Sequence, residues 1–155
     1  MYKKVLVPLD GSELAEHVLP HAGFIARGCG AEEVILLEVV EPFNPPKGWD
    51  GSVMNPEEVR DIDRKAKEAA ERYVQRVSDE LTLEKAAVRG DVVTGKPGEA
   101  ITEYAGRHAV DLIIIASHGR SGISRWLMGS VAEKVLRSSC VPVLIVRPPG
   151  CEPSL

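Results

Sequence analysis

The chain has 155 residues, of which 44% are hydrophobic and 27% charged, and its formal net charge is -4. This length suits one domain with its own core, and the acidic balance disfavours general nucleic-acid binding because no basic face can displace counterions. No apolar run approaches membrane-spanning length. Three cysteines without a C-x-x-C pair indicate reduced thiols, so we expect a cytoplasmic protein that does not contact membranes.

Strand-like and helical patterns alternate from the start of the chain. Residues 3–8 form a short apolar run closed by proline, which is typical of a buried strand. Ser12 is placed to cap the helix that follows, and Pro20 is expected to bend that helix. Residues 34–40 are almost continuously apolar, as expected for a strand covered on both faces of a sheet.

A long amphipathic helix is predicted next. Asn55 is its expected N-cap, followed by proline and two glutamates in the first turn. The charged residues between its apolar positions are expected to form a solvated face. We expect its buried stripe at Val59, Ile62, Ala66, Ala69, Tyr73, Val77 and Leu81.

The second half of the chain continues the alternation. Residues 86–93 predict a weaker strand in which Gly90 suggests a bulge, and a helix is expected from Lys96 to about His108. Residues 111–116 form the clearest core strand, and residues 141–147 form a last strand.

Five strands alternating with four helices predict an α/β fold with an open, mostly parallel sheet and helices on both faces. We expect one domain over residues 1–147 and a flexible tail over residues 148–155. Ligands of such sheets bind beyond the carboxyl ends of the strands, where the strand order reverses. Residues 8–12 and 116–119 are the segments expected to flank that crevice.

A glycine-rich loop over residues 117–130 connects a buried strand to the last helix. Ser130 and Glu133 match a capping box at the start of that helix. A helix N-terminus approached by glycines favours phosphate oxygens, although glycines can also serve only turns. The loop is not a P-loop, since no Gly-Lys-Ser/Thr closes it, and it lacks the G-x-G-x-x-G of dinucleotide-binding folds.

This loop resembles the nucleotide loop of universal stress proteins, whose ATP-binding branch carries G-x2-G-x9-G-[S/T]. Gly119, Gly129 and Ser130 match the last three defined positions of the motif, whereas Ala116 replaces its first glycine. Residues 5–12, 95–97, 130–136 and 141–143 also match in order. The chain is identified as a member of this family over residues 1–147.

The resemblance implies a Rossmann-like sheet of strand order 3-2-1-4-5 that binds ATP or another adenine nucleotide, with Mg²⁺ or Mn²⁺ on the phosphates. Adenine and ribose would lie at Pro8, Asp10 and Val39, and the phosphates at Ala116, Gly119, Gly129, Ser130 and Val131. The candidate nucleotide-binding residues are Pro8, Leu9, Asp10, Gly11, Ser12, Val39, Ile115, Ala116, His118, Gly119, Arg120, Gly122, Gly129, Ser130 and Val131. The resemblance also implies a symmetric homodimer formed through Val141 to Arg147.

Other polar residues support no catalytic assignment. Asp10 is expected to bond the ribose or a water on the bound cation, or only to cap the next turn. His118 is expected to bond a phosphate or the loop backbone. His17 and His21 are four apart on one predicted helix but lack a third metal ligand, so we expect a surface or half-buried pair. No Ser-His-Asp or Cys-His arrangement is evident.

The expected function is therefore a nucleotide-responsive regulatory or protective factor in stress response, acting on a protein partner that the sequence does not identify. Two alternatives remain open at this point. One is a slow, metal-dependent ATPase on the same fold. The other is a nucleotide-free dimeric interaction module, which Ala116 favours and which Gly119, Gly129 and Ser130 oppose.

Overall fold

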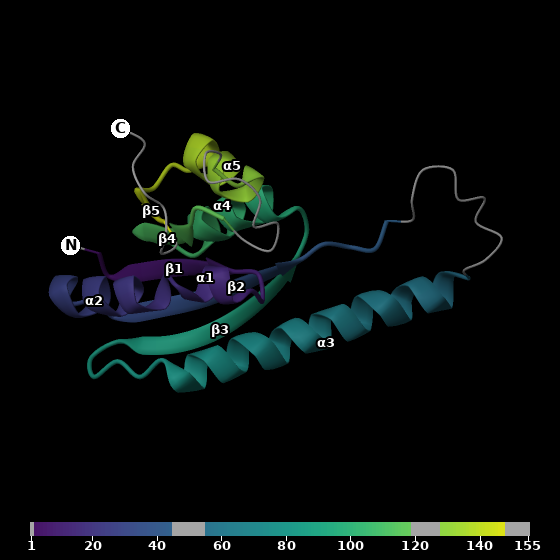
Figure 1. Cartoon of the computed structure of the whole chain (residues 1–155), viewed down its shortest axis with the longest axis horizontal. Helices are drawn as coiled ribbons and strands as arrows, with labels where there is room; N and C mark the ends of the chain where they lie inside the picture. The colour runs from purple at the N-terminus through teal and green to yellow at the C-terminus, as the bar shows by residue number, and fades with distance from the viewer. Residues whose placement is uncertain (1, 45–54, 119–127, 148–155) are drawn as a thin grey trace.

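A single parallel sheet organises the protein, in the order β3-β2-β1-β4-β5 (Figure 1). The computed structural model describes residues 2–44, 55–118 and 128–147. Within them the five strands are β1 (Lys4–Leu9), β2 (Glu33–Val40), β3 (Ala87–Thr94), β4 (Leu112–Ala116) and β5 (Val143–Val146). The predicted fold class and strand order are confirmed.

Helices cover both faces of the sheet. They are α1 (Glu13–Glu16), α2 (Leu19–Cys29), α3 (Pro56–Glu80), α4 (Pro97–Arg107) and α5 (Ser130–Ser138). The chain steps from β1 to β2 and β3 with α1, α2 and α3 on one face, and then crosses back to β4 and β5 with α4 and α5 on the other. Right-handed crossovers require this change of face when the direction of stepping reverses.

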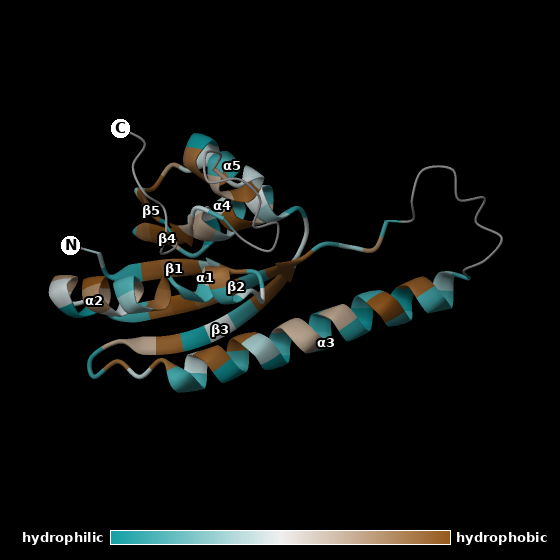
Figure 2. Ribbon diagram, in the orientation of Figure 1, coloured by the Kyte–Doolittle hydropathy of each residue, from teal (hydrophilic) through white to brown (hydrophobic). Residues whose placement is uncertain are grey.

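The core follows the strand pleat. In β1, Val5 and Val7 pack on the α1–α3 side, and Leu6 packs on the α4–α5 side. All three are fully buried, as are the apolar residues 34–37 of β2. Figure 2 shows these central strands as mostly hydrophobic, in agreement with a sheet covered on both faces. Among the described helices we find no segment with the length and hydrophobicity that spanning a membrane requires.

Pro20 divides the first helical region instead of bending it. Helix α1 ends at Glu16, and α2 begins at Leu19 with Pro20 in its first turn, where a missing N–H costs nothing. His17 therefore caps the C-terminus of α1 while His21 lies in α2, so the prediction of one helix carrying both histidines is wrong. Both side chains are exposed, as expected.

Gly90 forms no bulge, contrary to the prediction. β2 and β3 pair in unbroken register from Glu33 opposite Ala87 to Val40 opposite Thr94. A Cβ on Gly90 would lie 2.8 Å from Val74 Cγ2 of α3 and 3.0 Å from the carbonyl carbon of Val74. Glycine at this position lets the α3 backbone approach the strand closely.

The buried stripe of α3 also differs from the prediction. Ala70, Val74 and Val77 are buried, whereas Ala66 and Ala69 are exposed. Figure 1 shows the reason: the N-terminal part of α3 extends past the ends of the strands, so only its C-terminal part packs on the sheet. The predicted N-cap is confirmed, since Asn55 Oδ1 accepts from two first-turn N–H groups at 2.9 Å.

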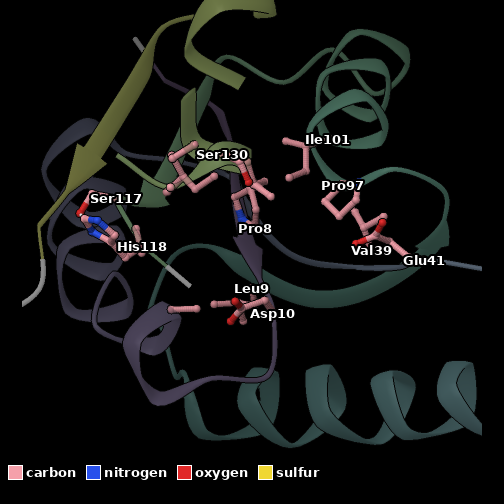
Figure 3. Close-up of a pocket in the computed structure, with 16 residues that line it drawn as sticks. Pro8, Leu9, Asp10, Val39, Glu41, Pro97, Ile101, Ser117, His118 and Ser130 are labelled. Carbon is pink, nitrogen blue, oxygen red and sulfur yellow. The ribbon is translucent and has the colours of Figure 1, made fainter. Parts of the chain in front are cut away.

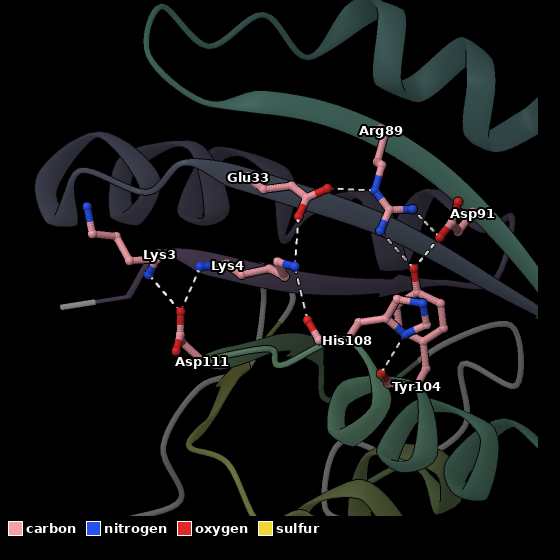
Figure 4. Close-up of polar contacts among 8 residues, drawn as sticks. All are labelled: Lys3, Lys4, Glu33, Arg89, Asp91, Tyr104, His108 and Asp111. Atoms are coloured by element: carbon pink, nitrogen blue, oxygen red, sulfur yellow. Dashed lines mark hydrogen bonds and ion pairs between the residues drawn. The ribbon is translucent and has the colours of Figure 1, made fainter.

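A polar network links the strands to α4 on the α4–α5 side of the sheet (Figure 4). Arg89 of β3 donates to Glu33 of β2 at 2.6 Å, contacts Asp91, and donates to the Tyr104 hydroxyl of α4 at 3.2 Å. Lys4 of β1 forms an ion pair with Glu33 at 3.3 Å. The Arg89 hydrogen bond holds the pKa of Glu33 below its usual value, and burial raises the pKa of Tyr104 to about 12.

Candidate functional site

A cavity of about 280 Å³ lies where β1 and β4 end side by side. The two strands are parallel neighbours, with Val5 opposite Leu112 and Leu6 opposite Ile113. The strand order reverses between them, and open α/β sheets bind ligands at such a reversal. The cavity is lined by ten of the expected residues (Figure 3): Pro8, Leu9, Asp10, Val39, Ile115, Ala116, His118, Gly129, Ser130 and Val131.

Six further residues that were not predicted from the sequence also line the cavity: Ala15, Glu41, Pro97, Ile101, Ser117 and Ala132. Pro97 and Ile101 belong to α4. This helix reaches the site because the β3–β4 crossover passes over the face of the sheet opposite to α1–α3. The sequence could have indicated Glu41 as a lining residue, because it lies two residues after Val39, just past the end of the same strand. Pro97 begins the helix that follows β3, so it shares the carboxyl edge of the sheet with the other loops.

The remaining expected residues lie elsewhere. Gly11 and Ser12 follow Asp10 but do not line the cavity. Gly11 has a φ of +77°, a left-handed conformation that favours glycine, and it turns the chain from β1 toward α1. Gly119, Arg120 and Gly122 lie outside the described residues.

The two ends of the glycine-rich segment meet at the cavity. The Gly129 N–H donates to the carbonyl oxygen of Ser117 at 2.7 Å. A Cβ on Gly129 would lie 3.0 Å from that oxygen and 3.5 Å from the Cα of His118. The φ of Gly129 is −59°, which any residue can adopt, so close packing and not conformation favours glycine here.

Helix α5 begins without a side-chain cap, contrary to the predicted capping box. Gly129 occupies the N-cap and Ser130 is the first helical residue. Because the helix starts one residue earlier than expected, Glu133 lies one position too far along to reach back, and it pairs with Arg137 at 2.9 Å. Residues 130–132 all line the cavity. The first-turn N–H groups of α5 therefore lie at the cavity with no side-chain acceptor among the described residues.

Ala116 fits its position without strain. It is the last residue of β4 and pairs with Val146 of β5. Among the described non-glycine residues, only Ala109 has a positive φ. The backbone at Ala116 therefore does not require glycine. Ala116 is 8% exposed and belongs to the core on the α1–α3 side.

Ser117 and His118 follow at the end of β4. Ser117 is 5% exposed, and its hydroxyl lies 3.0 Å from Nδ1 of His118. The other ring nitrogen, Nε2, is buried and has no hydrogen-bond partner in the described parts of the chain. A buried polar nitrogen of this kind normally has a hydrogen-bond partner, so a polar group of a ligand would be favoured beside this atom.

The charges around the cavity are mixed. The described lining includes the carboxylates of Asp10 and Glu41, with His118 as its basic side chain. No group of three or more His, Cys, Asp or Glu side chains that could hold a metal ion occurs among the described residues. A divalent cation here would consequently take most of its oxygen ligands from a bound ligand and from water.

Comparison with known proteins gives a consistent result. Residues 1–147 match the family model described as "Universal stress protein family". Universal stress protein MJ0577 of Methanocaldococcus jannaschii is 36% identical over 156 residues, covering 95% of this chain and 96% of that protein. Universal stress protein MJ0531 of the same organism is 33% identical, covering 98% and 86%.

Solved structures agree. The structure of MJ0577 superposes with a TM-score of 0.80 and covers 99% of both chains at 36% identity. The crystal structure of a universal stress protein in complex with cAMP has a TM-score of 0.59 at 27% identity, covering 94% of this chain and 97% of that one. On the family model, the identities and the shared fold, the chain belongs to the universal stress protein family.

Proposed function

We propose that this protein binds an adenine nucleotide, ATP first among them, in the cavity between the ends of β1 and β4. The observation that carries the proposal is the start of α5, where residues 130–132 line the cavity and no described side chain caps the helix. Uncapped N–H groups and the positive end of the helix dipole favour a phosphate. The cAMP complex of a relative supports an adenine nucleotide as the ligand class.

The base and ribose would occupy the part of the cavity away from α5. Val39, Pro97 and Ile101 offer apolar surface for the adenine ring (Figure 3). Asp10 is a hydrogen-bond acceptor for the ribose hydroxyls. Glu41 lies beside Val39 at the rim and adds a second acceptor at this end of the cavity.

The phosphates would lie against Gly129, Ser130 and Val131. Mg²⁺ or Mn²⁺ would bind mainly to the phosphate oxygens and water, with Asp10 contributing through a water molecule. When bound, this cation neutralises phosphate charge beside the acidic Asp10 and Glu41. His118 is positioned in the same wall, where its ring can donate to an anionic oxygen.

In this proposal the nucleotide regulates an interaction with a protein partner, and the protein acts in the cytoplasm as a stress-response factor. The proposal includes no catalytic residue. The slow ATPase alternative predicts repeated, metal-dependent release of ADP. The interaction-module alternative predicts no nucleotide binding after co-purified ligand has been removed.

We also propose a homodimer formed through β5. This strand lies at one edge of the sheet and pairs with β4 only, among the described strands. The carbonyl oxygens of Pro142 and Val146 accept hydrogen bonds from N–H groups in β4 and in the residue that follows it. Successive residues of a strand direct their backbone groups to opposite sides, so those of Val143 and Ile145 face the free edge. Ile145→Pro removes an outward N–H but no β4–β5 bond. Sedimentation equilibrium should show a dimer for the wild type and a monomer for this variant.

Calorimetric titration with ATP and Mg²⁺ tests the nucleotide proposal. Ser130→Glu places a carboxylate where the phosphates would lie, at an exposed first-turn position that tolerates acidic residues. Ser138→Glu, the matched control, makes the same change at the exposed far end of α5. We expect saturable binding by the wild type and by Ser138→Glu, and a loss of at least about tenfold in Ser130→Glu. Absence of wild-type binding would favour the interaction module.

A further inference from the structure

We infer that Ser12 is a positioning residue that orients the Asp10 carboxylate toward the nucleotide, an inference that rests on the proposed function. Ser12 does not line the cavity, whereas Asp10 does. The two are joined by two hydrogen bonds to one oxygen. The Ser12 hydroxyl donates to Asp10 Oδ1 at 2.6 Å, and the Ser12 backbone N–H donates to the same atom at 3.1 Å.

The Ser12 hydroxyl has no rotational freedom left. Its one proton is donated to Asp10, and its oxygen accepts from the Ala15 N–H of α1 at 3.2 Å. A hydroxyl has only one donor, so these two bonds determine its orientation. Gly11, with its left-handed backbone, brings Ser12 back within reach of Asp10. The carboxylate is thereby tied to a side chain that is itself fixed on α1.

The consequence concerns what Asp10 can recognise. An ionised carboxylate only accepts hydrogen bonds, so it needs a donor on the ligand. ATP offers donors at the two ribose hydroxyls and at the adenine amino group, and in the proposed placement the ribose is the part that lies at Asp10. Hydrogen bonds to a charged acceptor weaken steeply when their angle is poor. A carboxylate held in one rotamer by Ser12 would therefore bind a ribose hydroxyl more tightly than one that rotates freely.

The experiment compares ATP, 2′-deoxy-ATP and 3′-deoxy-ATP on wild type, Ser12→Ala, Ser12→Thr and Asp10→Ala. We expect Ser12→Ala to weaken ATP binding by about tenfold, the effect of one charge-assisted hydrogen bond. Ser12→Thr keeps the hydroxyl and should bind like the wild type. For the deoxy analogue that lacks the hydroxyl bound by Asp10, Ser12→Ala should change the affinity by less than about twofold.

A double-mutant cycle separates this role from the capping of α1. If Ser12 acts through Asp10, then Ser12→Ala has no further effect on ATP binding in the Asp10→Ala background. If Ser12→Ala weakens all three nucleotides equally, and still does so without Asp10, then Ser12 acts only as a helix cap and the inference is wrong.

Failure of the proposed function is recognised separately. If the wild type binds none of the three nucleotides, the function is wrong, and the pairing of the two residues is judged by NMR. Three-bond couplings should report a single χ1 rotamer of Asp10 in the wild type and in Ser12→Thr, and averaging in Ser12→Ala. A single rotamer in Ser12→Ala would overturn the positioning role.

Discussion

The Gly129 N–H donates a 2.7 Å hydrogen bond to the carbonyl oxygen of Ser117, so the end of β4 and the start of α5 are joined directly at the cavity. Two positions twelve residues apart in the sequence thus form one wall of the site. The same contact restricts the residue type, because a Cβ on Gly129 would lie 3.0 Å from that carbonyl oxygen.

Gly129→Ala should therefore separate β4 from α5 by a few tenths of an ångström. We expect a loss of about 1–2 kcal/mol in the free energy of unfolding, measured by urea denaturation, and weaker ATP binding by calorimetry. The cause is crowding alone, since alanine is unstrained at a φ of −59°. Unchanged stability together with unchanged affinity would contradict this account of the wall.

Gly90→Ala should destabilise the fold away from the cavity. The added methyl group would lie 2.8 Å from Val74 Cγ2 and 3.0 Å from the Val74 carbonyl carbon, so α3 must move from β3. We expect a loss of about 1–3 kcal/mol in thermal or urea unfolding. Gly28→Ala is the matched control: its Cβ meets nothing within 4 Å in helix α2, and it should stabilise by about 0.5–1 kcal/mol.

Ala116→Gly tests whether the missing motif glycine matters for binding. Because Ala116 lies in a strand with its methyl group in the core, glycine should lower the free energy of unfolding by about 1 kcal/mol. We expect the ATP affinity of this variant to stay within about twofold of the wild type. An increase of tenfold or more would show instead that the methyl group obstructs the nucleotide.

Glu33 should make stability depend on acid pH. Its pKa is lowered in the folded protein, chiefly by the Arg89 hydrogen bond, from an ordinary value of 4.5. Its carboxylate therefore stabilises the fold above about pH 4.5, and this contribution is lost as the pH falls through the lower, folded-state pKa. Urea unfolding should find Glu33→Gln about 1 kcal/mol less stable than the wild type at pH 6, and the gap should narrow as the pH falls below 4.5.

The control for this prediction is Glu32→Gln. Glu32 pairs with Lys3 at 2.7 Å, but its side chain is 71% exposed. An exposed pair contributes little, so this variant should follow the wild type over the same pH range. A gap between wild type and Glu33→Gln that stays constant from pH 6 to pH 3 would disprove the role of the Arg89–Glu33 contact.

The sequence by itself determined the alternation of strands and helices, and its resemblance to a known family supplied the strand order. Local patterns were sufficient for these features, because apolar runs and caps such as Asn55 depend on near neighbours in the chain. Strand ends and the glycine-rich loop predicted where the cavity would lie, and the family resemblance then implied the candidate residues, ten of which line it.

Only the tertiary structure decided which distant groups meet. The sequence suggested a bulge at Gly90, whereas glycine is favoured there by the close approach of Val74, which belongs to another element, α3. Pro97 and Ile101 reach the cavity only because the chain crosses the sheet between β3 and β4. Helix α5 begins one residue earlier than predicted, and its N-cap, Gly129, is hydrogen-bonded to Ser117. Packing between elements sets each of these contacts, and no local window of sequence contains both partners.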